Sequence, residues 1–131
     1  MESRQNLCIG AVALIDDGAM SVTVASIGLR RVLTVTGEID IATVDALRAA
    51  LAAAVDAVER DVWVDLSRVG FMDSSGLHAL MGARHALEPH RRRLTVIAPE
   101  GCARRTIEIA GLDGALRLQL DRESANRECT V

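Results

Sequence analysis

Apolar and polar residues alternate along two short segments in the first third of the chain. Residues 21–26 (SVTVAS) and 31–36 (RVLTVT) are rich in β-branched residues, and Gly28 lies between them. Alternation with a period of two is typical of strands that bury one face, and a glycine suits the turn that joins them. We therefore predict a β-hairpin over residues 21–36.

Three later segments carry apolar residues at intervals of three and four, which is the spacing of an amphipathic helix. They cover residues 43–58, 75–87 and about 101–110, and Pro89 and Gly111 follow the second and the third of them. Because proline cannot continue a helix and glycine favours the position after a helix end, we expect both helices to stop there.

Short β-branched segments separate these helices. Residues 61–67 (DVWVDLS) and 93–98 (RLTVIA) predict two strands, and residues 116–118 predict a last, short one. The resulting order, β-β-α-β-α-β-α-β, contains strand–helix–strand units, whose strands run parallel with right-handed crossovers. We therefore predict an α/β fold in which helices pack on a mixed β-sheet.

The chain has 131 residues, which fits a single domain. We assign residues 21–120 to that domain and residues 1–20 to an N-terminal extension with room for one extra edge strand. Residues 121–131 are predicted to form a polar C-terminal tail, because no clear amphipathic helix follows Leu120.

Composition narrows the range of functions. All fifteen basic residues are arginines, and eighteen acidic residues bring the net charge to −3. We do not expect direct nucleic-acid binding, which needs a basic face. The absence of lysine excludes a P-loop and Schiff-base chemistry.

The apolar run over residues 7–15 is too short to span a membrane, and its acidic flanks disfavour a signal peptide, so we expect no membrane association and a cytoplasmic protein.

Neither a metal nor a cofactor is predicted. Cys8, Cys102 and Cys129 are odd in number and form no C-x-x-C pair, which indicates neither a disulfide framework nor a zinc site. Redox activity of one of them stays open. His78 and His85 are seven residues apart on one predicted helix, about 10 Å along its axis, which is too far for one metal ion.

Two connections from a strand into a helix carry the candidate chemistry. The first is Gly37-Glu38-Ile39-Asp40, and the second leads through Phe71-Met72 into Asp73-Ser74-Ser75-Gly76. The carboxyl ends of parallel strands emerge at one edge of a sheet, where ligands and partners usually bind. We therefore expect Asp40 to lie near Asp73 and Ser74.

These polar residues have more than one interpretation. Aspartate and serine before a helix are common N-caps. Two hydroxyls followed by Gly76 also predict a small, exposed surface that a partner or a modifying enzyme can reach. A hydroxyl at a helix N-terminus suits a phosphate, because backbone N–H groups and the positive end of the helix dipole lie there. A hydrolase triad of Ser74 or Ser75 with His78 and Asp40 is disfavoured, because the G-x-S-x-G turn is absent.

Three segments carry a family resemblance: GEID at residues 37–40, VWVDL at residues 62–66 and FMDSSGL at residues 71–77. Together they resemble the STAS domain of bacterial anti-sigma factor antagonists. The resemblance covers roughly residues 21–120 and includes the order of the predicted elements.

The resemblance implies a partner-switching protein and not an enzyme. In that family an anti-sigma factor that is also an ATP-dependent serine kinase phosphorylates the first serine of the pair. The unphosphorylated antagonist binds this anti-sigma factor and so frees a sigma factor, and a serine phosphatase restores it. Carried over, Ser74 is the phosphoacceptor, Ser75 is an adjacent helper, and Asp40, Asp73 and Gly76 join both serines in the partner-binding surface. An accessory subunit of a transporter or of a stress-signalling complex is the alternative.

Overall fold

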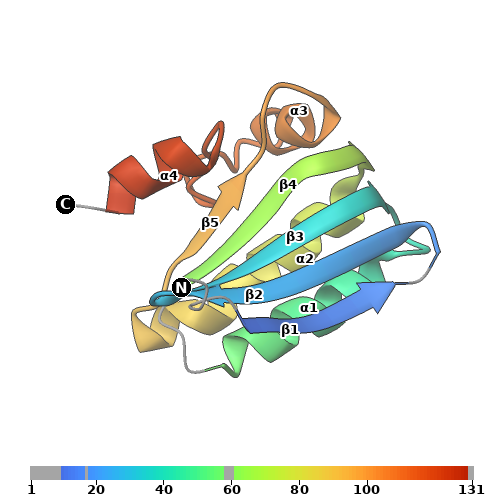
Figure 1. Ribbon diagram of the computed structural model, residues 1–131. Coiled ribbons are helices and arrows are strands. Elements are labelled where there is room, and N and C mark those ends of the chain that lie inside the picture. Colours follow the sequence, from blue (N-terminus) through green and yellow to red (C-terminus); the bar gives the residue numbers. More distant parts are fainter. Residues whose placement is uncertain (1–9, 17, 58–60, 130–131) are drawn as a thin grey trace.

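A computed structural model describes residues 10–16, 18–57 and 61–129. The strands are β1 (Gly10–Asp16), β2 (Met20–Ile27), β3 (Arg30–Ile39), β4 (Asp61–Met72) and β5 (Leu94–Ile97). The helices are α1 (Val44–Val55), α2 (Ser74–Leu87), α3 (Cys102–Ile109) and α4 (Arg122–Cys129), and a 3₁₀ turn, η2, covers Glu88–His90. Figure 1 shows α1 and α2 side by side against one face of the sheet, with α3 and α4 near β5.

The five strands form one mixed sheet in the order β1-β2-β3-β4-β5. The β1–β2 and β2–β3 pairs are antiparallel, whereas the β3–β4 and β4–β5 pairs are parallel. The predicted α/β fold is confirmed, with its hairpin and its parallel strands joined by helices. The additional strand β1 lies at the sheet edge, within the segment assigned to the N-terminal extension.

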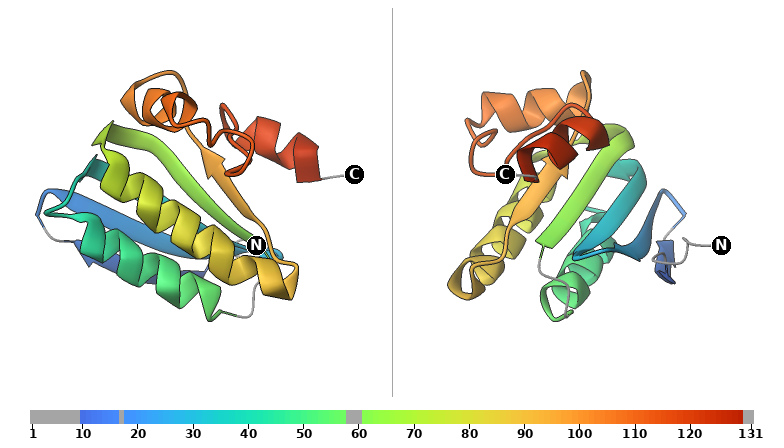
Figure 2. Two further views of the ribbon diagram at one scale, coloured as in Figure 1. Left: turned by 180° about the vertical axis from the view of Figure 1, so that it is seen from behind. Right: turned by 60° about the vertical axis from the view of Figure 1, so that its left-hand side comes forward.

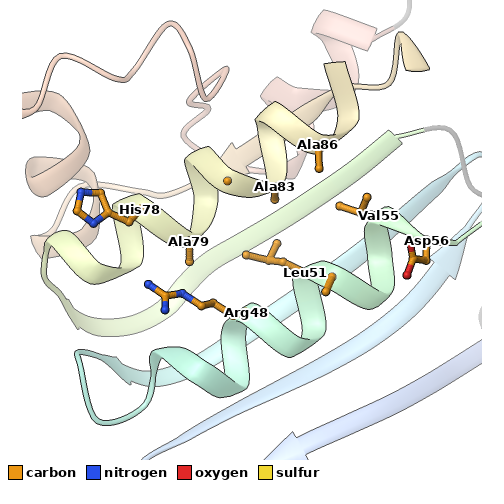
Figure 3. Close-up of a pocket in the computed structure, with 10 residues that line it drawn as sticks. Arg48, Leu51, Val55, Asp56, His78, Ala79, Ala83 and Ala86 are labelled. Carbon is orange, nitrogen blue, oxygen red and sulfur yellow. The ribbon is translucent and has the colours of Figure 1, made fainter. Parts of the chain in front are cut away.

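The main core lies between the sheet and the pair α1 and α2. Alternate residues of the strands point into it, and the interior strand β4 contributes Val62, Val64 and Leu66, which are almost fully buried. Figure 2 shows the two helices covering this face from behind. Between α1 and α2 a shallow groove of about 340 Å³ is lined largely by small and apolar side chains (Figure 3).

A smaller cluster lies on the opposite face of the sheet. Val32, Trp63 and Ile97 pack there against Ala125 of α4. The guanidinium of Arg30 lies 4.0 Å from the centre of the Trp63 ring. This second cluster fixes α4 over one end of that face.

The C-terminal region differs from expectation in two respects. Residues 116–118 do not form a strand, and Leu116 and Arg117 lie in a turn. The pairing with β5 is an isolated bridge between Gln119 and Ile97, next to a hydrogen bond from the Val96 N–H to the Leu116 carbonyl at 3.0 Å. Arg117 has a φ of 49°, which is incompatible with extended backbone. The polar tail contains the helix α4. Among the side chains of α4 that the structure describes, only the small Ala125 is buried against the sheet, so no apolar periodicity in the sequence predicts this helix.

β3 and β4 are both longer than predicted, and their extra residues carry the site. β4 runs on to Met72 because β3 lies alongside it as far as Ile39. Gly37 allows β3 to continue past β2: its φ is 107°, and a Cβ at this position would lie 2.2 Å from the Ala19 carbonyl oxygen.

Candidate functional site

The two predicted connections meet at one edge of the sheet. Ile39 and Met72 are paired at the ends of the parallel strands β3 and β4. The Asp73 N–H donates to the Ile39 carbonyl at 3.1 Å. Asp40 and Asp73 therefore begin neighbouring loops, as the sequence predicted, although 33 positions separate them in the chain.

Asp73 is the N-cap of α2. Its backbone is extended, and its Oδ1 accepts from the Ser75 N–H at 2.9 Å and from the Ser75 hydroxyl. The hydrogen bond from that hydroxyl, followed by those from backbone N–H groups, holds the pKa of Asp73 below its usual value. Asp73 is thus an ionised cap, and its partner Ser75 is half-buried and already bonded.

Ser74 is in a different environment. It is the first residue of α2 and is exposed. Within the described part of the chain its hydroxyl has no hydrogen-bond partner. Of the two neighbouring serines, Ser74 therefore presents the accessible hydroxyl.

Asp40 shapes the loop that faces this serine pair. Its Oδ1 accepts from the N–H groups of Ala42 and Thr43 at 2.9 and 3.1 Å. The hydroxyl of Thr43 donates to the Glu38 carbonyl at 2.8 Å. Asp40 is not the N-cap of α1, a position that Thr43 occupies; instead it holds the turn before that helix. Its carboxylate remains half-exposed.

Gly76 does not belong to an open surface, contrary to the expectation from the sequence. It is buried, and a Cβ at this position would lie 2.6 Å from Met72 Cγ and 3.0 Å from Ile39 Cγ2. Glycine is required here because the first turn of α2 packs directly on the ends of β3 and β4. Gly76 therefore lets α2, the helix that presents Ser74, pack closely on the strand ends. The exposed surface is formed by the residues next to Gly76 and not by Gly76 itself.

Two exposed apolar residues at this edge were not predicted as site residues. Ile41 follows Asp40 and is 83% exposed, and Phe71 precedes Asp73 by two positions and is 42% exposed. The sequence feature that could have indicated Ile41 is its position directly between a predicted strand and a predicted helix. Large apolar side chains exposed beside a polar site are typical of protein-binding surfaces.

The site does not assemble a hydrolase triad. The Ser75 hydroxyl donates to Asp73, and the Asp40 carboxylate accepts from its own loop. In the part of the chain that the structure describes, His78 makes no hydrogen bond to either side chain. Serine, histidine and aspartate are therefore present in the region without the hydrogen bonds that would activate a nucleophile.

Residues 10–16, 18–57 and 61–129 contain no group of three His, Cys, Asp or Glu side chains that could hold a metal ion. Cys102 is exposed and unpaired; Cys8 lies outside the described residues, and so does the side chain of Cys129. No helix among these residues is both long and apolar enough to cross a bilayer.

Comparison with known proteins agrees with the fold and with the motif. The family model described as "Mlab, STAS domain" matches residues 22–120, which include both loops. The anti-sigma-B factor antagonist of Staphylococcus aureus is 35% identical over 78 residues, covering 60% of this chain and 72% of the relative. This chain belongs to the STAS-domain anti-sigma factor antagonists.

Other members of the family match over a longer part of the chain. The anti-sigma-F factor antagonist RsfB of Mycobacterium tuberculosis is 34% identical over 100 residues, which are 76% of this chain and 81% of RsfB. The crystal structure of an anti-sigma factor antagonist from Mycobacterium paratuberculosis superposes with a TM-score of 0.79 at 29% identity, covering 86% of this chain and 96% of that one. The unphosphorylated form of SpoIIAA shares the fold, with a TM-score of 0.70 at 22% identity over 84% of this chain and 97% of its own.

Proposed function

We propose that this STAS protein is a phosphorylation-controlled antagonist of an anti-sigma factor in the cytoplasm. Its unphosphorylated form binds an anti-sigma factor with serine kinase activity and so frees a sigma factor. Phosphorylation of Ser74 ends this binding, and a serine phosphatase restores it. The observation that carries the proposal is the exposed hydroxyl of Ser74 at the start of α2, which has no hydrogen-bond partner among the described residues.

The contacts at the start of α2 support the expectation that this helix tolerates a phosphate on Ser74. Asp73 caps α2 through Ser75, so the cap does not depend on the Ser74 hydroxyl. A phosphate on the first residue of a helix also meets the positive end of the helix dipole. We therefore expect α2 to keep its conformation when Ser74 is phosphorylated, with the change confined to the surface.

A phosphate would alter that surface strongly. It adds a charge of about −1.5 to −2 at neutral pH. Ionised Asp73 is already adjacent, and the loop of Asp40 begins at the neighbouring strand end. Ile41 and Phe71 offer apolar area for docking at the same edge. A partner that covers this edge must desolvate the new dianion or place it against like charge, at a cost of several kcal/mol.

The direct test is incubation with candidate anti-sigma kinases and ATP, followed by mass-spectrometric mapping of the phosphate. We expect phosphate on Ser74 and none on the Ser74→Ala variant, which should bind the kinase constitutively. Ser74→Asp should weaken binding at least about tenfold, equivalent to about 1.4 kcal/mol. A Ser74→Asp variant that binds as tightly as wild type, or a phosphate mapped to another residue, contradicts the proposal.

The alternative role is that of an accessory subunit of a transporter or a stress-signalling complex. Such a subunit should bind its complex whether or not Ser74 carries a phosphate. Affinity capture with Ser74→Ala and Ser74→Asp as paired baits separates the two roles, since an anti-sigma factor must be retained only by the first.

A further inference from the structure

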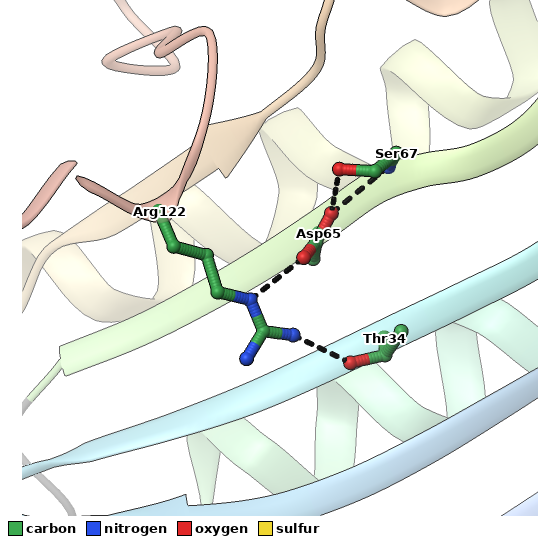
Figure 4. A network of polar contacts seen from close by, with 4 residues as sticks. All are labelled: Thr34, Asp65, Ser67 and Arg122. Atoms are coloured by element: carbon green, nitrogen blue, oxygen red, sulfur yellow. Dashed lines mark hydrogen bonds and ion pairs between the residues drawn. The ribbon is translucent and has the colours of Figure 1, made fainter. Parts of the chain in front are cut away.

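A polar depression lies on the face of the sheet opposite α1 and α2. Its volume is about 570 Å³, and it is lined by Thr23, Thr34, Asp65, Ser67, Arg68 and Arg122. Thr23, Thr34 and Asp65 stand on the neighbouring strands β2, β3 and β4, and Arg122 reaches in from α4 (Figure 4). The relationship to anti-sigma factor antagonists assigns no role to this depression.

The acceptors of the depression are largely occupied. Asp65 Oδ1 accepts from the Ser67 N–H at 2.9 Å and from its hydroxyl at 2.5 Å, and Asp65 Oδ2 accepts from Arg122 Nε at 2.7 Å. The Thr34 hydroxyl accepts from Arg122 Nη2 at 2.9 Å. The single negative charge of the depression is therefore already paired with one guanidinium.

The donors, in contrast, are in excess. Arg68 and Thr23 are exposed, and neither side chain has a partner within the described chain. The third nitrogen of Arg122, Nη1, has no hydrogen-bond partner among the described residues. The Thr34 hydroxyl accepts a hydrogen bond but donates to none of the described residues. Two guanidinium groups and one carboxylate leave this depression with a net positive charge, although the chain as a whole is acidic.

A concave site with spare donors, paired acceptors and net positive charge is chemically suited to an oxyanion. We propose that it binds a phosphate group, with Arg68, Arg122 Nη1 and the hydroxyls of Thr23 and Thr34 as the donors. Guanidinium groups bind phosphate oxygens with charge-assisted, geometrically matched hydrogen bonds. A volume of about 570 Å³ exceeds the size of one phosphate, so the site has room for a small organic phosphate monoester.

Such a ligand would act on α4. Arg122 is the first residue of this helix, and Arg68 belongs to β4, so an anion held by both would join the helix to the sheet. Further along, α4 is fixed by Ala125 in the second cluster and by the hydrogen bond from Arg30 to Asn126 at 2.7 Å. Binding should therefore stabilise the docked position of α4 over Trp63.

The probes are inorganic phosphate and phenyl phosphate, titrated at constant ionic strength and followed by the amide resonances of the full chain. We expect saturable shifts at β4 and at the start of α4, together with a change in the fluorescence of Trp63, which is the single tryptophan of the chain. Tighter binding of phenyl phosphate identifies a monoester as the ligand, and tighter binding of phosphate identifies the free ion. Shifts that never saturate, or that spread over all surface arginines, overturn the proposal.

Matched variants make the test specific. Arg68→Gln removes no contact within the described residues and should stay folded, as circular dichroism will show, while affinity falls roughly tenfold or more, the usual effect of losing a hydrogen bond to a charged group. Arg105→Gln removes an exposed arginine of α3 outside the depression and should leave affinity unchanged. Equal losses in both variants overturn the proposal. Ser74→Ala should bind phosphate like wild type, so this outcome is independent of the phosphorylation switch.

Discussion

Arg122 and Asp65 form an ion pair that links α4 to the strand β4, across 57 positions of the chain. The Nε–Oδ2 distance is 2.7 Å, and the Asp65 side chain is only 9% exposed. Burial alone would raise the pKa of Asp65, but the hydrogen bonds from Ser67 and the contact with Arg122 outweigh it, so this pKa lies below its usual value. The pair therefore consists of two charged groups, one of them largely removed from water.

Breaking this pair should destabilise the protein measurably. Arg122→Gln leaves the Asp65 carboxylate with Ser67 as its remaining partner, and we expect the free energy of unfolding to fall by roughly 1–2 kcal/mol, since Arg122 itself is partly exposed. Urea denaturation of Arg122→Gln, Asp65→Asn and the double variant gives a double-mutant cycle. A coupling energy above about 0.5 kcal/mol is expected; strictly additive losses would show that the two side chains do not interact.

Stability should depend on pH through the same carboxylate. The pKa of Asp65 is lower in the folded chain than its ordinary value of 3.8, so its contribution is present above that value and is lost as the pH falls through the folded-state pKa. Unfolding free energies measured from about pH 6 to pH 2 should decline less steeply in Asp65→Asn than in wild type. Parallel curves for the two proteins would show that Asp65 does not contribute to the loss of stability at low pH.

Two glycines of α2, Gly76 and Gly82, should respond in opposite ways to substitution by alanine. Gly76→Ala places a Cβ against Met72 and Ile39, and we expect a loss of roughly 1–3 kcal/mol from overpacking. Gly82 faces the groove between α1 and α2, and a Cβ there meets nothing within 4 Å, so Gly82→Ala should stabilise the helix by roughly 0.5–1 kcal/mol. Thermal unfolding of both variants tests the difference in sign; destabilisation of similar size in both would refute this account of Gly76.

The two serines should have separable effects on Asp73. The hydroxyl of Ser75 is the main cause of the lowered pKa of Asp73, so Ser75→Ala should raise that pKa towards its ordinary value of 3.8. Ser74→Ala should leave it unchanged, because the Ser74 hydroxyl does not contact the carboxylate. Carboxyl carbon shifts of Asp73 followed by NMR through a pH titration decide this. An equal rise in both variants would mean that the serines share the capping hydrogen bond.

Asp40 should stabilise the loop before α1 through the hydrogen bonds that its carboxylate oxygen accepts. Asp40→Asn keeps an oxygen that can accept from Ala42 and Thr43, whereas Asp40→Ala removes it. We expect Asp40→Ala to lose roughly 1 kcal/mol of stability while staying folded, and Asp40→Asn to lose less. If both variants bind a partner equally poorly, the charge of Asp40 contributes to recognition; if only Asp40→Ala binds poorly, the loop conformation does. Chemical denaturation and circular dichroism provide the check on folding.

The sequence predicted the parts of the fold that depend on local periodicity. The hairpin and the amphipathic helices repeat apolar residues with the period of their own backbone, and the strand at residues 61–67 is marked by its β-branched residues. The short connections then require parallel strands at one edge. The same reasoning placed Asp40, Asp73 and Ser74 together, since residues that end neighbouring parallel strands must emerge side by side.

What the sequence did not reveal depends on tertiary contacts. Among the described side chains of α4 only Ala125 is buried, and the helix is fixed through Arg122 and Arg30, whose partners are distant in the chain. The role of Gly76 depends on Met72 and Ile39, which come from two strands. Arg92, within a charged run, donates to the Val55 and Ala54 carbonyls at the end of α1, 37 and 38 positions away. No local pattern encodes such pairings.

The hydrogen bond from the Asp73 N–H to the Ile39 carbonyl joins the two loops of the site through main-chain atoms alone. Every residue except proline can provide the same donor, and every residue the same acceptor. Substitution of Ile41 or Phe71 should therefore change the side chains exposed at this edge while the geometry that displays Ser74 persists.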